Sequence, residues 1–417
     1  MSHPKLQAPR GTYDVLPEQA SDRLRVEVAA RSILEAAGYR RAETPTFEAT
    51  ELFARGVGEA TDIVRKEMYS FEDAGGRSLT LRPEGTAPIC RAYLEHGMHT
   101  LAQPVKLWYL SSFFRQEKPQ AGRYRQFWQV GAEAIGSDDP AVDAESIVLL
   151  HALLGELEVG DVRLRLGSLG RPATRADYRE KLTTYLRVHQ SHLSEEVVAR
   201  IDLNPLRAFD ASDRGTVEVM RDAPRLMDEL DAADAEHFDE VCARLGAAGI
   251  PWEIDDTLVR GLDYYTRTIF EFTSDALGAQ SGVGGGGRYD SLIGMLGGPE
   301  TPGMGWAAGI ERMLIAAGAH PAATPFCDLY VAHEDGAGVQ AFALAHEART
   351  AGLAVQQELG GRSLKGQLKQ ADRAGARYVA VVAEDTTRLR DMDSGEQEDL
   401  PSAAAAIAHV LKGRGRL

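Results

Sequence analysis

The chain has 417 residues, of which 44% are hydrophobic and 26% charged, enough for two or three domains with cores of their own. Acidic residues outnumber basic ones by 62 to 46, and the net charge of −16 argues against non-specific coating of nucleic acid, so RNA contact would need local basic patches. No stretch approaches the roughly 20 apolar residues that span a bilayer, and the start lacks the apolar core of a signal peptide. We therefore expect a soluble, cytoplasmic protein without a membrane partner.

The first part of the chain alternates helix-like and strand-like stretches. Apolar periodicity predicts a helix near Glu18–Ala37. Strand patterns follow at Ser78–Arg82, Val105–Phe114 and Gln126–Ile135. Residues of about 171–249 read as almost wholly helical, and strand character returns at Leu258–Phe272 and Gly282–Gly309. We predict an α+β domain over residues 1–323 that is interrupted by a helical insertion.

A small-residue, proline-marked stretch at residues 318–325 reads as a linker. Residues 324–417 then predict a compact α/β unit. Its expected strands are Leu329–Ala332, Leu353–Val355 and Tyr378–Val382, and its expected helices are Val339–Thr350, Ser363–Ala374 and Ala403–Leu411.

The three cysteines are odd in number and far apart, so they predict neither a disulfide framework nor structural zinc. Two pairs of closely spaced histidines lack the flanking residues of a metal site. We expect no dedicated metal ligands in the chain.

The most informative segment is Phe113–Glu133, in which two strand-like arms flank a Pro/Gly turn. Period-two alternation on the second arm places Phe127, Gln129, Gly131 and Glu133 on one face, opposite an apolar face. An aromatic plane, an amide, a gap at glycine and a carboxylate suit a small polar ligand. The same alternation is typical of a solvent-exposed face of an antiparallel sheet.

Three arginines, Arg115, Arg123 and Arg125, lie within this hairpin without an equal set of acids. Guanidinium groups bind phosphate through bidentate hydrogen bonds, which indicates a nucleotide. The chain has no Walker-type loop, and the glycine-rich run Gly282–Asp290 is expected to mark close backbone approach and a tight turn.

The hairpin resembles motif 2 of the class II aminoacyl-tRNA synthetases. Residues 303–312 are similar to motif 3 of that class, and residues 38–45 to motif 1, its dimer-interface element. Two more segments, 258–266 and 285–290, resemble the signature peptides of the histidyl-tRNA synthetases, and residues 9–14, 82–86 and 204–207 agree. The resemblance implies a class II antiparallel sheet flanked by helices and followed by a C-terminal anticodon-binding domain.

The resemblance also implies a role for each matching residue. For histidine these are Glu84, Thr86 and Gln129 at the α-amino group, Glu133 and Tyr264 at the imidazole, and Tyr265 lining the pocket. For ATP they are Arg115 at the α-phosphate, Glu117 at the adenine edge, Phe127 stacked on adenine, and Arg123 and Arg312 at the outer phosphates.

The reaction implied is attack of the histidine carboxylate on the ATP α-phosphorus, followed by transfer to histidine tRNA. Two anions must meet, so cationic stabilisation and positioning should carry most of the acceleration. Arg260 is the residue expected to be catalytic, together with Arg115; a surface ion pair of Arg260 with Asp263 is the alternative. Mg²⁺ is expected on the phosphates, held mainly by ATP and water.

For tRNA, the resemblance implies contacts from Gln120 in the motif 2 loop and from the anticodon-binding domain. Arg362, Lys365, Lys369 and Arg373 recur at helical spacing and predict one basic stripe, although such a run is equally typical of a solvated helix face.

The motif 2 loop departs from the family pattern where an arginine and a lysine are usual. Lys118 and Ala121 stand at these positions, which leaves recognition of the acceptor end open.

Two other functions remain open. One is a synthetase-like regulatory subunit of the ATP phosphoribosyltransferase of histidine biosynthesis; such paralogues typically lack the C-terminal domain and lose catalytic residues. The other is a catalytically silent tRNA-binding sensor. Retention of the C-terminal domain, the arginines and the pocket residues favours the enzyme, for which we expect a homodimer.

Overall fold

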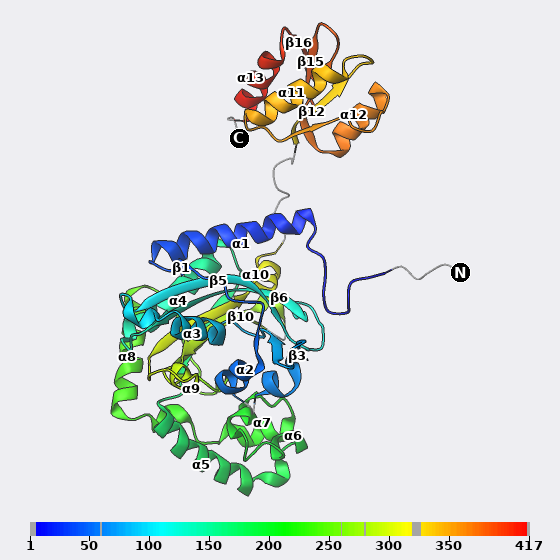
Figure 1. Ribbon diagram of the computed structural model, residues 1–417. Coiled ribbons are helices and arrows are strands. Elements are labelled where there is room, and N and C mark those ends of the chain that lie inside the picture. The colour runs from blue at the N-terminus through cyan, green and yellow to red at the C-terminus, as the bar shows by residue number, and fades with distance from the viewer. Residues whose placement is uncertain (1–5, 59–60, 260, 279–280, 319–326, 415–417) are drawn as a thin grey trace, which may run out of the picture. The chain divides into compact units, whose positions relative to one another are not determined.

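The computed structural model describes residues 6–58, 61–259, 261–278, 281–318 and 327–414. The chain divides into two compact units, residues 1–319 and 320–417 (Figure 1). The domain boundary expected between residues 323 and 324 lies outside the described residues and stays a prediction. None of the described helices is long and apolar enough to cross a membrane.

The first unit is built on an eight-stranded sheet with the strand order β1-β5-β6-β11-β10-β9-β7-β8. Neighbouring strands are antiparallel except at the two edges, where β1 pairs with β5 and β8 with β7 in parallel. In that order the strands are Arg40–Arg41, Val105–Phe114, Gln126–Ile135, Gly303–Gly309, Gly282–Arg288, Thr266–Ser274, Val162–Ser168 and Glu253–Ile254. The α+β class predicted from the sequence is confirmed.

One face of this sheet is covered by four helices, α1 (Pro17–Ala36), α4 (Pro140–Glu156), α8 (Ala232–Ala247) and α10 (Ile310–Ala317). The alternation predicted along β6 is confirmed here, because Val130, Ala132 and Ala134 are buried against these helices. Local sequence begins the helices: Asp139 caps α4 by accepting a hydrogen bond from the Ala141 amide, and Pro140 starts its first turn.

The opposite face of the sheet carries a second, more polar core. Helix α3 (Thr86–Glu95) and the insertion helix α5 (Pro172–Val188) pack here together with α9 (Leu292–Met295). The insertion continues through α6 (Glu195–Val198) and α7 (Arg214–Arg221), and α5 to α7 lie on the side of the sheet away from α1 (Figure 1). The last helix of the expected insertion, α8, packs instead on the face that α1 covers. A three-stranded sheet, β2 (Phe47–Ala49), β4 (Ser78–Leu81) and β3 (Tyr69–Glu72), adjoins α2 (Thr50–Val57).

The glycines of the run form a strand, as the strand character expected from residue 282 predicts, and a turn follows at Asp290 and Ser291. Strand β10 lies between β11 and β9, where a Cβ on Gly286 would come within 1.9 Å of the Gly305 carbonyl oxygen. The close backbone approach expected from the sequence is therefore confirmed. Strand β9 begins at Thr266 rather than at residue 258, and the stretch before it contains turns.

The second unit has a five-stranded sheet with the order β13-β12-β14-β15-β16. Its strands are β12 (Cys327–His333), β13 (Val355–Gln357), β14 (Ala376–Val382), β15 (Thr387–Asp391) and β16 (Gln397–Leu400). Helices α11 (Gly338–Thr350) and α13 (Ala403–Arg414) cover one face, and α12 (Leu364–Arg373) covers the other. The last two strands were not expected from the sequence.

Candidate active site

The site begins at the loop before α3, where Glu84 is buried. Its carboxylate accepts hydrogen bonds from the backbone amides of Thr86 (2.8 Å) and Ala87 (3.0 Å), at the positive end of the helix. The Tyr264 hydroxyl lies 3.4 Å from the same carboxylate. Burial nevertheless raises the pKa of Glu84 above its usual range. Arg82 fixes this loop by donating to the backbone oxygens of Ser112 and Thr44.

A second carboxylate, Glu133 on β6, lies beside the first with no exposed surface. The side-chain hydroxyl of Thr86 donates to its Oε1 (2.8 Å) and that of Tyr289 to its Oε2 (2.7 Å). The Tyr109 hydroxyl lies 3.4 Å from Oε1. Burial raises the pKa of Glu133 to about 8, against the opposing effect of these hydrogen bonds. The solvent-exposed sheet face that the alternation also allowed is wrong at this residue.

Glycines make room for this cluster. A Cβ on Gly85 or Gly131 would lie 2.4 Å from the ring of Tyr109, and one on Gly305 would lie 1.7 Å from Glu133 Oε2. Tyr109 and Gly131 are directly opposite in the β5–β6 register. The gap at Gly131 expected to hold ligand is therefore filled by a tyrosine. The six residues expected around histidine otherwise lie on this face, with Tyr264 and Tyr265 in ring contact at 4.8 Å.

Tyr109 and Tyr289 were not among the residues expected at the site. The pairing of Tyr109 with a glycine on the neighbouring strand indicates that the ring lies over that glycine. This pairing can be recognised only when the register of the two strands is known. Gln129, which was expected, lies on β6 and has a buried side-chain oxygen without a hydrogen-bond partner in the described residues. An unsatisfied buried acceptor on a cavity wall suits a ligand donor group.

Next to this cluster is an open cavity of about 600 Å³. It is lined by the motif 2 hairpin, β10, β11 and the start of α10, including Arg115, Glu117, Arg123, Phe127, Gln129 and Arg312. All the residues that were expected to bind ATP, apart from Arg260, therefore line one cavity. Gln129 also lines it and lies on the same face of β6 as Glu133, so it connects the cavity with the carboxylate cluster.

The arginines of this cavity are held by few contacts. Arg115 donates to the Pro83 oxygen (2.9 Å), lies over the Phe127 ring (5.3 Å) and is 3.7 Å from Glu117. Arg123 is 3.3 Å from Glu117, and its side chain is 45% exposed. Arg312 donates to the Gly282 oxygen, and burial lowers its pKa. Such a set of guanidinium groups suits a polyphosphate.

The remaining expected residues are those assigned to catalysis and to tRNA. Arg260 is outside the described residues, so its expected role and its alternative both stay predictions. Gln120, Lys118 and Ala121 are exposed in the motif 2 loop. Lys365, Lys369 and Arg373 are exposed on α12, whereas Arg362 precedes that helix and pairs with Glu358 at 3.2 Å.

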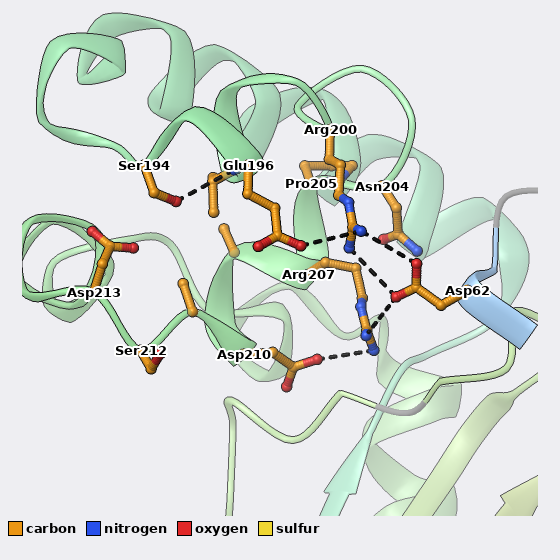
Figure 2. A pocket seen from close by; sticks show the side chains of 13 residues that line it. Asp62, Ser194, Glu196, Arg200, Asn204, Pro205, Arg207, Asp210, Ser212 and Asp213 are labelled. Atoms are coloured by element: carbon orange, nitrogen blue, oxygen red, sulfur yellow. Dashed lines mark hydrogen bonds and ion pairs between the residues drawn. The ribbon is translucent and has the colours of Figure 1, made fainter. Parts of the chain in front are cut away.

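A further cavity, of about 300 Å³, lies within the insertion (Figure 2). Arg200 and Arg207 both point at the carboxylate of Asp62, at 3.2 and 3.5 Å. Asn204 donates to Asp263, just before Tyr264. These contacts attach the insertion to the segments that hold Asp62 and Asp263. Both of these residues line a cavity together with Arg115 and Arg123.

The sheet, with an arginine-lined cavity on its motif 2 and motif 3 strands, has the class II aminoacyl-tRNA synthetase fold. The family model described as histidyl-tRNA synthetase matches residues 11–313. The chain is 45% identical to the histidine–tRNA ligase of Rubrobacter xylanophilus, over 97% of this chain and 99% of that one, and 48% identical to that of Halorhodospira halophila, over 92% of each. It superposes on the apo histidyl-tRNA synthetase of S. aureus with a TM-score of 0.82 and 33% identity, covering 97% and 100% of the two chains. The chain belongs to the histidyl-tRNA synthetase family.

Proposed function

We propose that the protein is a histidine–tRNA ligase that activates L-histidine with ATP and transfers it to the terminal adenosine of histidine tRNA. The observation that carries the proposal is a buried cluster with two carboxylates, Glu84 and Glu133, beside an arginine-lined cavity. The first suits a small cationic substrate and the second suits a triphosphate. The retained C-terminal unit and the arginine set favour an active enzyme over a regulatory subunit or a silent tRNA sensor.

In the pocket, Glu84, Thr86 and Gln129 bind the α-amino group. Glu133 and Tyr264 bind the imidazole, with Tyr265 beside them. Recognition of both ring nitrogens penalises analogues that lack either, because a buried carboxylate or hydroxyl then loses its partner. The support for this assignment is that Glu84, Glu133 and Tyr264 are buried within one cluster. The buried side-chain oxygen of Gln129 has no hydrogen-bond partner in the described residues and could accept from the ligand.

In the cavity, Phe127 stacks on adenine, whose edge contacts Glu117, and Arg123 and Arg312 bind the outer phosphates. Arg115 and Arg260 meet the α-phosphate, where the histidine carboxylate attacks in line and pyrophosphate leaves. Fixed guanidinium groups stabilise the charge that spreads over the phosphoryl oxygens. They also offset the repulsion between the two reacting anions.

Mg²⁺ would assist by neutralising the phosphates. Within the described ranges, no group of three or more His, Cys, Asp or Glu side chains could hold a metal ion. We expect the ion to be carried mainly by ATP and water, since Mg²⁺ keeps much of its hydration shell.

Two further parts of the proposal concern assembly and tRNA. A homodimer through the motif 1 region is supported by Leu24 and Val28 of α1, which are 60% and 59% exposed, and by the edge strand β1. Gln120 would contact the acceptor end, and the exposed cations of α12, with Arg362, the anticodon region. Deleting residues 324–417 should then weaken tRNA charging far more than adenylate formation, and equal losses would contradict this division.

The deciding experiment is histidine-dependent ATP–pyrophosphate exchange followed by tRNA charging on the purified protein. We expect both activities. A regulatory subunit would show neither, and a silent sensor would bind tRNA without exchange. Arg260→Ala should abolish most exchange while leaving ATP binding measurable; near-normal exchange would refute the catalytic role of Arg260.

A further inference from the structure

Residues Pro9–Asp14, here called the N-terminal strap, lie against the loop of the motif 2 hairpin. The Arg125 amide donates to the Gly11 oxygen at 2.7 Å, and the Arg125 guanidinium reaches the Arg10 oxygen at 3.4 Å. The rings of Tyr13 and Tyr124 are 4.6 Å apart between centroids. Since Tyr124 itself lines the arginine cavity, the strap supports one wall of that cavity.

The strap is anchored on a single, largely buried carboxylate, Glu311 at the start of α10. The Tyr13 hydroxyl donates to it at 2.6 Å and the Arg23 guanidinium at 2.9 Å. The Trp128 amide, on β6, lies 3.2 and 3.1 Å from its two oxygens. Arg23 also donates to the Tyr13 hydroxyl and lies over the Trp128 ring at 5.0 Å. One carboxylate thus joins the strap, α1, β6 and α10.

The fit of the strap on the loop depends on Gly11. Its φ is +87°, a backbone conformation that side chains other than glycine rarely adopt. A Cβ there would also lie 2.9 Å from side-chain atoms of Arg125 and Pro119. Two separate constraints therefore make this position intolerant of a side chain.

Within the described residues, the loop that the strap touches is also held by contacts of its own, among them a hydrogen bond from the Arg125 guanidinium to the Glu117 oxygen at 3.3 Å. Gln120 and Arg123 exchange two backbone hydrogen bonds of 3.1 and 2.9 Å, and the Arg123 side chain pairs with Glu117 while nearly half exposed. A cation that must meet a phosphate needs a fixed position, because displacement by about 1 Å can cost up to 100-fold in rate.

We propose that the N-terminal strap is a positioning element of the reaction. Gly11 and Tyr13, anchored by Glu311, hold the motif 2 loop so that Arg123 and Tyr124 present the correct surface to ATP. The strap acts through the loop and touches no substrate itself. This inference rests on the proposed function, since it requires ATP to bind in the arginine cavity.

The test is Gly11→Ala, with Gly76→Ala as the matched control. Gly76 also has a positive φ, +75°, but a Cβ there meets nothing within 4 Å, so it reproduces the backbone strain without the collision. We expect Gly11→Ala to lower kcat/KM for ATP in pyrophosphate exchange by about 10-fold or more, with the histidine Kd unchanged. Gly76→Ala should match the wild type in both. Equal behaviour of the two variants, or a matching loss of histidine affinity, would overturn the proposal.

Should Gly11→Ala be too unstable to assay, Tyr13→Phe decides the question. It removes only the hydroxyl that reaches Glu311, and Tyr185→Phe is its control, because that hydroxyl donates to the Val219 oxygen inside the insertion. Only Tyr13→Phe should raise the KM for ATP. The wild-type protein, assayed alongside, tests the proposed function separately. If the wild type shows no pyrophosphate exchange, the proposed function is wrong. If it shows exchange, the variants test only the role of the strap.

Discussion

The two halves of the candidate site are built in opposite ways. In the histidine pocket the carboxylates of Glu84 and Glu133 are buried, and short, packed side chains and backbone amides supply their hydrogen bonds. The lining of the neighbouring cavity includes the long side chains of Arg115, Arg123 and Arg312, and that of Arg123 is nearly half exposed. The proposed histidine site is therefore held by contacts within the protein, whereas the proposed ATP cavity includes an arginine, Arg123, that is open to solvent.

This contrast sets what each half responds to. A buried carboxylate is sensitive to protonation and to the loss of a single partner, because no water replaces it. Exposed guanidinium groups keep their charge at all relevant pH values but are screened by salt. Substitutions in the pocket should therefore change histidine binding sharply while leaving ATP binding intact, and those in the cavity should do the reverse.

The largest expected effect is that of Glu133→Gln. The amide has the same shape but cannot carry the negative charge that offsets a bound imidazolium. Breaking a buried charged pair of this kind should weaken histidine binding by about 100- to 1000-fold. Equilibrium dialysis with histidine and with ATP separately measures it. Glu156→Gln, on an exposed part of α4, is the control, and a loss of ATP affinity as large as that of histidine would contradict the contrast between the two halves.

In the cavity, Arg115→Lys should be more damaging than Arg123→Lys. Arg115 is held by the Pro83 oxygen and the Phe127 ring and is 21% exposed, whereas Arg123 has the Glu117 carboxylate and more solvent. Lysine keeps the charge but loses the planar fork, so we expect about a 100-fold loss of kcat/KM for ATP at Arg115 and about 10-fold at Arg123. Pyrophosphate exchange measures both, and the reverse order would show that exposure does not rank these cations.

A smaller loss is expected from Gly131→Ala, which places a methyl group against Tyr109. Overpacking moves the tyrosine away from Glu133, and we expect histidine affinity to fall by about 10- to 50-fold. Gly155→Ala is the matched control, since a Cβ at that helical position meets nothing within 4 Å. Unchanged histidine affinity in a folded Gly131→Ala protein would mean that Tyr109 has no part in recognition.

Much of this arrangement could be predicted from the sequence, because the strongest local signals coincide with the site. The strands Val105–Phe114 and Gln126–Ile135 have the predicted bounds, since both are rich in β-branched, aromatic and other apolar residues between turn signals. The faces of β6 were also predicted correctly. The adjacency of Arg115, Phe127 and Arg312 follows once the hairpin and motif 3 are placed in one sheet.

What could not be predicted depends on partners distant in the sequence. The ring of Tyr109 fills the gap at Gly131 because the two residues are opposed in register, and alternation along one strand does not fix that pairing. The strand character of the glycine run was expected, but its pairing with β9 on one side and β11 on the other could not be predicted from the run alone. The role of Tyr13 likewise emerges only where Glu311, 298 positions along the chain, comes within hydrogen-bond distance.

The smallest effect expected is the pH dependence of histidine binding, and it tests whether a proton is shared in the pocket. Burial raises the pKa of Glu133 to about 8, while free imidazole has a pKa of about 6.5. Between pH 6.5 and 8, free Glu133 is protonated and the imidazole of free histidine is not, so the two groups together hold one proton. The complex also needs one proton, shared between the carboxylate and the ring. Histidine affinity should therefore not change with pH in this range.

Outside this window the proton count changes. Below pH 6.5 both free groups are protonated, so binding releases one proton and histidine affinity should fall by up to about 10-fold for each unit that the pH decreases. Above pH 8 neither free group is protonated, so binding takes up one proton and histidine affinity should fall again as the pH rises. Calorimetry in buffers of different ionisation enthalpy measures the protons exchanged on each side. In the Glu133→Gln protein, the loss of histidine affinity above pH 8 should disappear while the loss below pH 6.5 remains. Only the imidazole ring then titrates, and the amide oxygen accepts a hydrogen bond from the neutral ring. A wild-type affinity that is flat through pH 9 would mean that Glu133 keeps its proton and does not share it with the ring.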